Sequence, residues 1–183
     1  MSSKKEQEQN VTVGDNVNIG DSVIIARRPY AHSGPCGQRV GFTCGSFDLL
    51  HPGHVIMIQE AKEVCDWLIV GVQSDPTIDR SQKNKPLQSH EERTIMVEAL
   101  KHVDEVVQYD TEADLLQLLK KIAPDIRILG TDHMDKEYTG KDLPIEVHFN
   151  KRDHDWSTTN LRKRVYESEK EKEKINWSYK GGE

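Results

Sequence analysis

Residues 45–54 read GSFDLLHPGH, and this stretch joins an apolar run to a segment with helical periodicity. Its two histidines, His51 and His54, are separated by Pro and Gly, so both imidazoles can face one point. The helix expected after them offers free backbone N–H groups and the positive end of its dipole to an anion. The stretch therefore predicts a phosphate site at the end of a strand, where charge that grows during a reaction can be stabilised.

Strand-like runs alternate with helical stretches from Gly37 onward. The runs that are typical of buried strands are 40–44, 67–72, 105–109, 126–129 and 145–149. Helical stretches follow them, including one that Ser89 and Glu92 begin as a capping box and a last one after 157–159. This alternation predicts an α/β fold with a doubly wound, parallel, five-stranded sheet of the Rossmann-like kind. In such a sheet, ligands bind beyond the carboxyl ends of the strands.

The chain has 183 residues and a net charge of −6, from 25 Lys and Arg against 31 Asp and Glu. A net acidic protein is a poor general binder of nucleic acids or anionic membranes, since both need a basic field. No apolar run approaches the roughly 20 residues of a membrane span, and no signal peptide is recognisable. The three cysteines have no regular spacing, which argues against a disulfide framework or a zinc site. We therefore expect a cytoplasmic protein without nucleic-acid or membrane partners.

The two ends of the chain differ in composition from the middle. We expect an N-terminal tail and β arm over 1–36, a catalytic domain over 37–166 and a charged tail over 167–183. Within the arm, 11–28 repeats every six residues, which resembles the hexapeptide repeat of left-handed β-helix acyltransferases. Three hexads make a single coil and cannot bury a core. The segment is therefore expected to be a short hairpin or arm that packs on the domain or on a neighbouring subunit.

Two stretches at opposite ends of the domain resemble one family. The pattern G-x-F-D-x-x-H-x-G-H of cytidylyltransferases is matched at 45–54, which makes the chain similar to the H-x-G-H nucleotidyltransferase superfamily. Residues 152–159, RDHDWSTT, resemble the R-T-E-G-I-S-T-T segment of glycerol-3-phosphate cytidylyltransferases, except at the four positions after Arg152. The resemblance covers about 40–165 and implies the nucleotidyltransferase fold, in agreement with the alternation of strands and helices.

Weaker matches lie between these two stretches. Glu92-Arg93 resembles the family's E-x-R element, and 101–106 resembles its R-Y-V-D-E-V element with Lys101 in place of Arg. Lysine keeps the charge but loses the bidentate fork of arginine. Residues 130–133, GTDH, are similar to a G-D-D-type segment after the fourth strand, which makes Asp132 a candidate carboxylate of the ligand site.

The resemblance implies roles for residues along the whole domain. Catalytic roles fall to His51, His54, Arg152 and a lysine of one loop, either Lys83 or Lys85. The residues expected to bind the nucleotide are Thr43, Gly45, Ser46, Phe47, Gly53, Arg93, Lys101, Asp132, Ser157, Thr158 and Thr159. Asp48 is expected to bind the acceptor, and no metal site built by the protein itself is implied.

Several of these residues also have a purely structural interpretation. Ser157 can be an ordinary helix N-cap, and Asp132 can form an Asx turn. Lys101 can be a solvated lysine at a helix end, and Lys83 and Lys85 can be solvated loop residues. The histidines of 45–54 can be a core pair or zinc ligands, but the chain has no H-E-x-x-H and no paired C-x-x-C.

The resemblance implies that a nucleoside triphosphate, which carries Mg²⁺, reacts with a phosphorylated small molecule and releases pyrophosphate. The acceptor phosphate is already ionised at pH 7, so it needs neither a general base nor a Ser or Cys nucleophile of the protein. The sequence contains no G-x-x-x-x-G-K-[ST] loop. Catalysis then depends on in-line positioning and on neutralising the charge that builds on phosphate oxygens.

The motifs favour transfer of CMP from CTP to glycerol 3-phosphate. Adenylyltransferases that use ATP on a sugar phosphate of the heptose type, or on FMN, share both ends of the pattern, and Lys85-Pro-Leu resembles a loop of the heptose enzymes. A non-catalytic nucleotide-binding module that acts in assembly is the alternative from another class. The resemblance also implies a homodimer.

Overall fold

The computed structural model describes residues 17–19, 22–24 and 37–180, with side chains over 37–174. Its centre is a five-stranded sheet in which every neighbouring pair of strands is parallel. The strands, in the order β5-β4-β3-β6-β7, are β5 (Glu105–Tyr109), β4 (Trp67–Gln73), β3 (Val40–Gly45), β6 (Ile126–Gly130) and β7 (Glu146–Asn150). The predicted fold class is confirmed, and the last strand lies one residue later than expected.

Four α-helices follow the strands, as the alternation predicts. They are α1 (Pro52–Glu63), α2 (His90–Glu98), α3 (Glu112–Ile122) and α4 (Thr158–Lys180). The predicted capping box of α2 is present, because the Ser89 hydroxyl accepts from the Glu92 N–H and the Glu92 carboxylate accepts from the Ser89 N–H. Helix α3 ends at Ala123, which adopts a left-handed φ of 45° just before Pro124.

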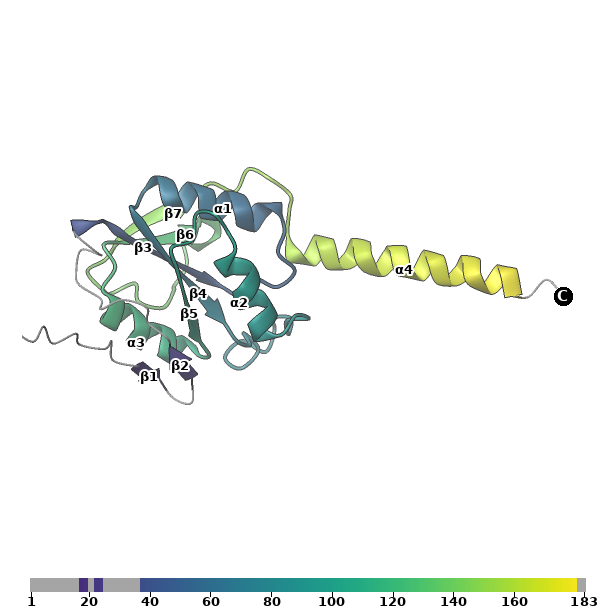
Figure 1. The fold of residues 1–183 in the computed structure, drawn as a ribbon, viewed down its shortest axis with the longest axis horizontal. Coiled ribbons are helices and arrows are strands. Elements are labelled where there is room, and N and C mark those ends of the chain that lie inside the picture. Colours follow the sequence, from purple (N-terminus) through teal and green to yellow (C-terminus); the bar gives the residue numbers. More distant parts are fainter. Residues whose placement is uncertain (1–16, 20–21, 25–36, 181–183) are drawn as a thin grey trace, which may run out of the picture.

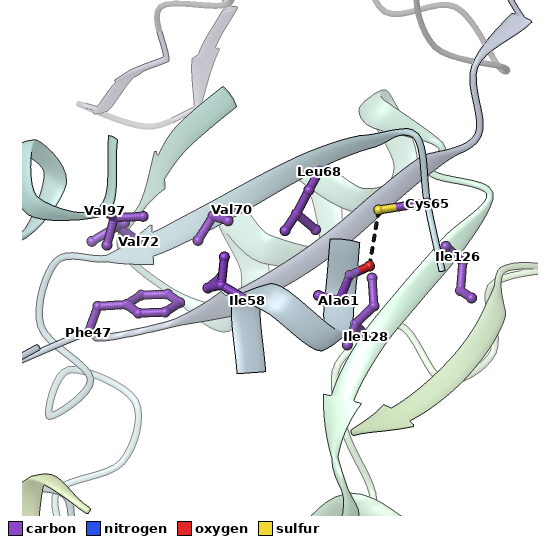
Figure 2. Packing of buried hydrophobic residues seen from close by; sticks show 10 residues of the cluster. All are labelled: Phe47, Ile58, Ala61, Cys65, Leu68, Val70, Val72, Val97, Ile126 and Ile128. Carbon is purple, nitrogen blue, oxygen red and sulfur yellow. Dashed lines mark hydrogen bonds between the residues drawn. The ribbon is translucent and has the colours of Figure 1, made fainter. Parts of the chain in front are cut away.

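Helices cover both faces of the sheet, which gives the molecule three layers (Figure 1). On one face, α1 and α2 pack on β4 and β6, and Figure 2 shows Ile58, Val70 and Ile128 in this cluster. On the other face, the apolar side of α3 packs on β3, β4 and β5. Because side chains alternate along a strand, Ile128 faces α1 while its neighbour Arg127 faces the α3 side.

The strand order reverses between β3 and β6. The chain runs from β3 outward through β4 to β5 and then returns by α3 to β6 on the other side of β3. Loops that leave β3 and β6 at this point diverge and open a crevice at the carboxyl ends of the strands. The stretch 45–54 leaves β3 here, and the segment that leads to α4 leaves β7, the strand next to β6.

Strands β1 and β2 and helix α4 extend the chain beyond the five-stranded sheet and the helices that cover it. Strands β1 (Val17–Ile19) and β2 (Ser22–Ile24) pair antiparallel, as expected for a hairpin, whereas the rest of 1–36 lies outside the described residues. Helix α4 runs through the expected boundary at 166 without a break and projects from the domain as a single rod (Figure 1). In the described part of the chain, no helix is both long and apolar enough to cross a membrane.

Candidate active site

His51 and His54 lie at the amino end of α1, as the sequence predicts. Their rings are stacked, with centroids 3.9 Å apart and planes inclined by 21°. The backbone N–H of His51 donates to Nδ1 of His54 over 3.4 Å. Because Nδ1 accepts, the proton of the neutral His54 ring lies on Nε2, on the opposite side of the ring. His54 therefore presents an N–H donor at the positive end of a helix.

Burial favours the neutral form of both imidazoles. The pKa of His54 is lowered to about 4, chiefly because the ring is withdrawn from water and secondarily because of the neighbouring His51. The pKa of His51 is also lowered, first by burial and then by the charges of His154 and Arg152. A neutral imidazole still has one N–H, which can donate to a phosphate oxygen. The pair is therefore suited to stabilise charge on a phosphate.

His154 is a third imidazole at this point, and the sequence analysis did not assign it a role. A Cβ added to Gly53 would lie 2.7 Å from Cε1 of His154 and 3.0 Å from Cε1 of His51. Nδ1 of His154 is buried without a hydrogen-bond partner, as is Nδ1 of His51. The ring of Trp156 lies 5.1 Å from that of His154 and helps to hold it. The sequence signal for His154 is that a histidine stands at this position, where the family pattern has glutamate.

The stretch 45–54 is tied to the start of α4. The Thr158 hydroxyl donates to the Asp48 carbonyl over 3.1 Å, and Arg162 donates to the Asp48 carboxylate over 3.1 Å. The same carboxylate accepts from the N–H groups of Leu87 and Gln88. Asp48 was predicted to bind the acceptor, but its carboxylate is buried and holds three segments of the chain together instead.

Arg93 was predicted to bind the nucleotide, and the structure gives it a different role. Its side chain is only 1% exposed. Its guanidinium donates at 2.5 to 3.2 Å to five backbone carbonyls, those of Ser46, Gln73, Ser74, Gln88 and Ser89. Four of its five N–H hydrogens are used in these contacts, because the single Nε–H is shared by two carbonyls, so Arg93 positions the loops around the site.

A cavity of about 680 Å³ lies beyond the carboxyl ends of the strands, where the fold predicts a ligand site. Six of the predicted site residues are in its wall: Gly45, Ser46, Asp48, Lys83, Thr158 and Thr159. The cavity extends to the α3 side of the sheet, where Arg80, Arg127 and Glu112 line it. Lys83 rather than Lys85 faces the cavity, since Lys85 pairs with Asp75 over 3.7 Å.

Other predicted residues lie outside the cavity wall. Lys101 is exposed in the turn between α2 and β5, at the amino edge of the sheet and outside the cavity wall, and its role in nucleotide binding stays a prediction. Asp132 is exposed in a short 3-10 helix, η2 (Thr131–His133), next to the cavity-lining His133. Arg152 is exposed near His51.

Three predicted residues, Thr43, Phe47 and Ser157, lie next to the site but not in the cavity wall. Thr43 and Phe47 are buried, and the Phe47 ring lies 5.3 Å from the ring of His54, which fixes the imidazole from behind. The Ser157 hydroxyl accepts from the Asn160 N–H, as an N-cap of α4 does. Its O–H hydrogen is free to donate to a ligand.

Comparison with known proteins agrees with this geometry. A family model described as Cytidylyltransferase-like matches residues 42–168, which include both predicted motifs. The chain belongs to the cytidylyltransferase-like family. The matched residues include the H-x-G-H stretch on which the sequence analysis depended, and the predicted nucleotidyltransferase superfamily is confirmed.

Curated relatives within this family are named Bifunctional protein HldE. The protein from Helicobacter pylori (strain HPAG1) is 36% identical over 129 residues, which are 70% of this chain and 28% of that protein. The one from Wolinella succinogenes is 41% identical over 112 residues, 61% of this chain and 23% of that protein. This chain thus spans about a quarter of the length of the curated relatives that it matches.

Solved structures give the same fold. The lipopolysaccharide core biosynthesis protein of Thermoplasma volcanium is 28% identical, with a TM-score of 0.53, over 65% of this chain and all of that one. Pantothenate synthetase of Thermus thermophilus is 14% identical, with a TM-score of 0.52, over 71% of this chain and 63% of that one. The second likeness concerns the fold alone.

Proposed function

We propose that this protein transfers AMP from ATP to the phosphate group of a sugar phosphate and releases pyrophosphate. The observation that carries nucleotidyl transfer is the stacked pair His51 and His54 at the amino end of α1, tied through Asp48 to the start of α4. No phosphorylated enzyme intermediate is needed, because the acceptor phosphate is itself a charged nucleophile. The protein has only to align the two reactants and stabilise the developing charge.

In this mechanism the acceptor phosphate attacks the α-phosphorus of the nucleotide in line with the departing pyrophosphate. Nε2–H of His54 donates to an α-phosphate oxygen, and His51 supports it. The hydroxyls of Ser157 and Thr159, with Arg152, hold the β- and γ-phosphates. Mg²⁺ enters with the nucleotide as part of the substrate and neutralises the same oxygens.

The names of the relatives favour ATP and a sugar phosphate over CTP and glycerol 3-phosphate. The curated relatives are named HldE, and a solved relative is described as a lipopolysaccharide core biosynthesis protein. Lys85-Pro86-Leu87 also resembles the corresponding loop of heptose-type adenylyltransferases. Transfer of CMP to glycerol 3-phosphate is the second candidate, which the full G-x-F-D-x-x-H-x-G-H match at 45–54 supports.

A substrate panel tests the proposal. The full chain is incubated with Mg²⁺, one of ATP or CTP, and one of a heptose 1-phosphate, glucose 1-phosphate or glycerol 3-phosphate, and pyrophosphate release is measured. We expect the highest kcat/KM with ATP and a sugar 1-phosphate. The highest kcat/KM with CTP and glycerol 3-phosphate would establish the second candidate instead. Nucleotide binding without pyrophosphate release in any pair would point to a non-catalytic module.

A further inference from the structure

Arg127 is a buried cation and the second residue of β6. Its side chain is 3% exposed and lies in the wall of the cavity, on the α3 side of the sheet. The guanidinium donates to the carbonyl of Thr139 and lies over the Tyr138 ring, 5.4 Å from its centroid. Its Nε is buried without a hydrogen-bond partner. A buried guanidinium is unfavourable by several kcal/mol unless an anion compensates it.

The protein does not supply that anion within the described residues. The carboxylates in the cavity wall each pair with another cation: Asp48 with Arg162, Glu112 with Arg80, and Glu137 with Lys141. Over residues 37–174, neither Arg127 nor the cavity-lining Lys83 has an ion pair. The cavity therefore contains one uncompensated cation on its inner wall and one at its exposed rim.

Arg127 and the imidazole pair lie on opposite sides of the sheet. Ile126 and Ile128 pack in the cluster that α1 covers, so Arg127 between them points to the other face. His51 and His54 begin α1 and belong to the first face. A single phosphate group is too small to contact a guanidinium on one face and an imidazole at the end of a helix on the other. An acceptor whose phosphate attacks the α-phosphorus held at the imidazole pair must carry a separate group to reach Arg127.

We propose that the cavity is the acceptor site and that the acceptor carries a second anionic group, which Arg127 binds. This inference rests on the proposed nucleotidyl transfer and adds the chemical class of its acceptor. The phosphate that attacks the nucleotide lies at the Ser46 and Thr158 end of the cavity, and a carboxylate or second phosphate lies at the Arg127 end. Arginine is well suited to this, since its planar fork matches both kinds of anion.

Matched acceptors test the inference with the wild-type chain. Glucose 1-phosphate and glucuronic acid 1-phosphate differ only by a carboxylate at the far end, as do glycerol 3-phosphate and 3-phosphoglycerate. Glucose 1,6-bisphosphate places a phosphate there instead. With Mg²⁺ and ATP, and with CTP in parallel, we expect kcat/KM to be about tenfold or more higher for the anionic member of a pair, as one charge-assisted hydrogen bond provides.

Variants show whether Arg127 is responsible. Arg127→Gln is expected to abolish the preference for the anionic acceptor, and Arg127→Lys to leave part of it. Arg164→Gln, an exposed arginine of α4, removes the same charge and serves as the matched control. A second readout is the rise in melting temperature with glucuronic acid 1-phosphate and no nucleotide, which Arg127→Gln should abolish and Arg164→Gln should not.

The outcomes separate the two proposals. Pyrophosphate release with no preference in any pair would overturn the second-anion inference and leave nucleotidyl transfer standing. A preference that Arg127→Gln leaves unchanged would overturn the role of Arg127. If Arg127→Gln does not fold, the preference of the wild type for anionic acceptors and its reduction in Arg127→Lys still test the inference. No pyrophosphate from any combination would overturn the proposed function itself.

Discussion

Arg162 donates to the buried carboxylate of Asp48 over 3.1 Å, and this ion pair joins the H-x-G-H stretch to the first turns of α4. The two residues are 114 positions apart in the chain. Asp48 is 5% exposed and Arg162 is 27% exposed, so the pair is shielded from water far more than the ion pairs further along α4. The contact explains how two distant motifs form one site.

Breaking the Asp48–Arg162 pair should lower catalytic activity, whereas breaking an exposed ion pair of α4 should not. Arg162→Gln leaves the Asp48 carboxylate buried without its cation and frees the start of α4 to shift. We expect kcat/KM for pyrophosphate release to fall about tenfold or more, since small misplacements of reacting groups are costly. Lys163→Gln, the exposed neighbour of Arg162, is the control and should change little. Equal effects of the two substitutions would contradict this role of the ion pair.

The depressed pKa of His54 makes a pH-dependent prediction. Between pH 6.5 and about 4, the unfolded chain binds a proton at this ring that the folded chain does not. The free energy of unfolding must therefore fall as the pH is lowered through this range, by up to about 3 kcal/mol from this ring. Denaturant unfolding of the wild type and of His54→Asn from pH 4 to 7 measures it.

The free energy of unfolding of His54→Asn should fall less steeply toward pH 4 than that of the wild type. Gln59→Asn, which changes an exposed side chain of α1 that does not titrate, should keep the wild-type slope. Parallel curves for the wild type and His54→Asn would show that the ring is not held neutral by the fold.

A glycine at position 53 leaves room for two imidazole rings that pack against its backbone. In Gly53→Ala, the new Cβ would lie 2.7 Å from the ring of His154 and 3.0 Å from that of His51, so both rings must move. We expect kcat to fall by about 10²-fold, the loss that a misplacement near 1 Å can cause. Adding His154→Ala to this variant restores space and should recover part of the rate. Activity of Gly53→Ala equal to that of the wild type would mean that this packing is irrelevant to turnover.

Arg93 should contribute strongly to the free energy of unfolding. Arg93→Met removes the guanidinium donors from five backbone carbonyls, three of them where the chain leaves β3 and β4. Loss of stability of about 3 kcal/mol or more is expected, measured by denaturant unfolding. Arg39→Met is the control, because Arg39 forms an exposed pair with Glu146 and should contribute less than about 1 kcal/mol. Similar losses in both variants would contradict the assignment.

The sequence predicts the sheet and its helices because their signals are local. Apolar runs, the Ser89 capping box and Pro124 after α3 each depend on residues close in the chain. The H-x-G-H stretch is also local, and its place at a strand end follows from the alternation. These features were predicted to within about one residue at the strand ends.

The roles of single polar residues depend on contacts between distant segments. Arg93 and Asp48 have the residue types of ligand contacts, but whether their polar atoms face a ligand or the chain is decided by carbonyls and N–H groups up to 114 positions away. Arg127 sits inside an apolar run that looks like any buried strand. His154 meets Gly53 only after the sheet is assembled, so its departure from the family pattern did not reveal by itself that its ring joins the site.

The central claim is that His54 stabilises charge at the α-phosphate of a bound nucleotide. Its most direct test is steady-state pyrophosphate release from Mg²⁺, ATP and a sugar 1-phosphate by the wild type and by His54→Asn, with ATP affinity measured in parallel. The account predicts that kcat falls by about 10²-fold or more while ATP affinity changes only a few-fold. Turnover of His54→Asn at the wild-type rate would contradict it.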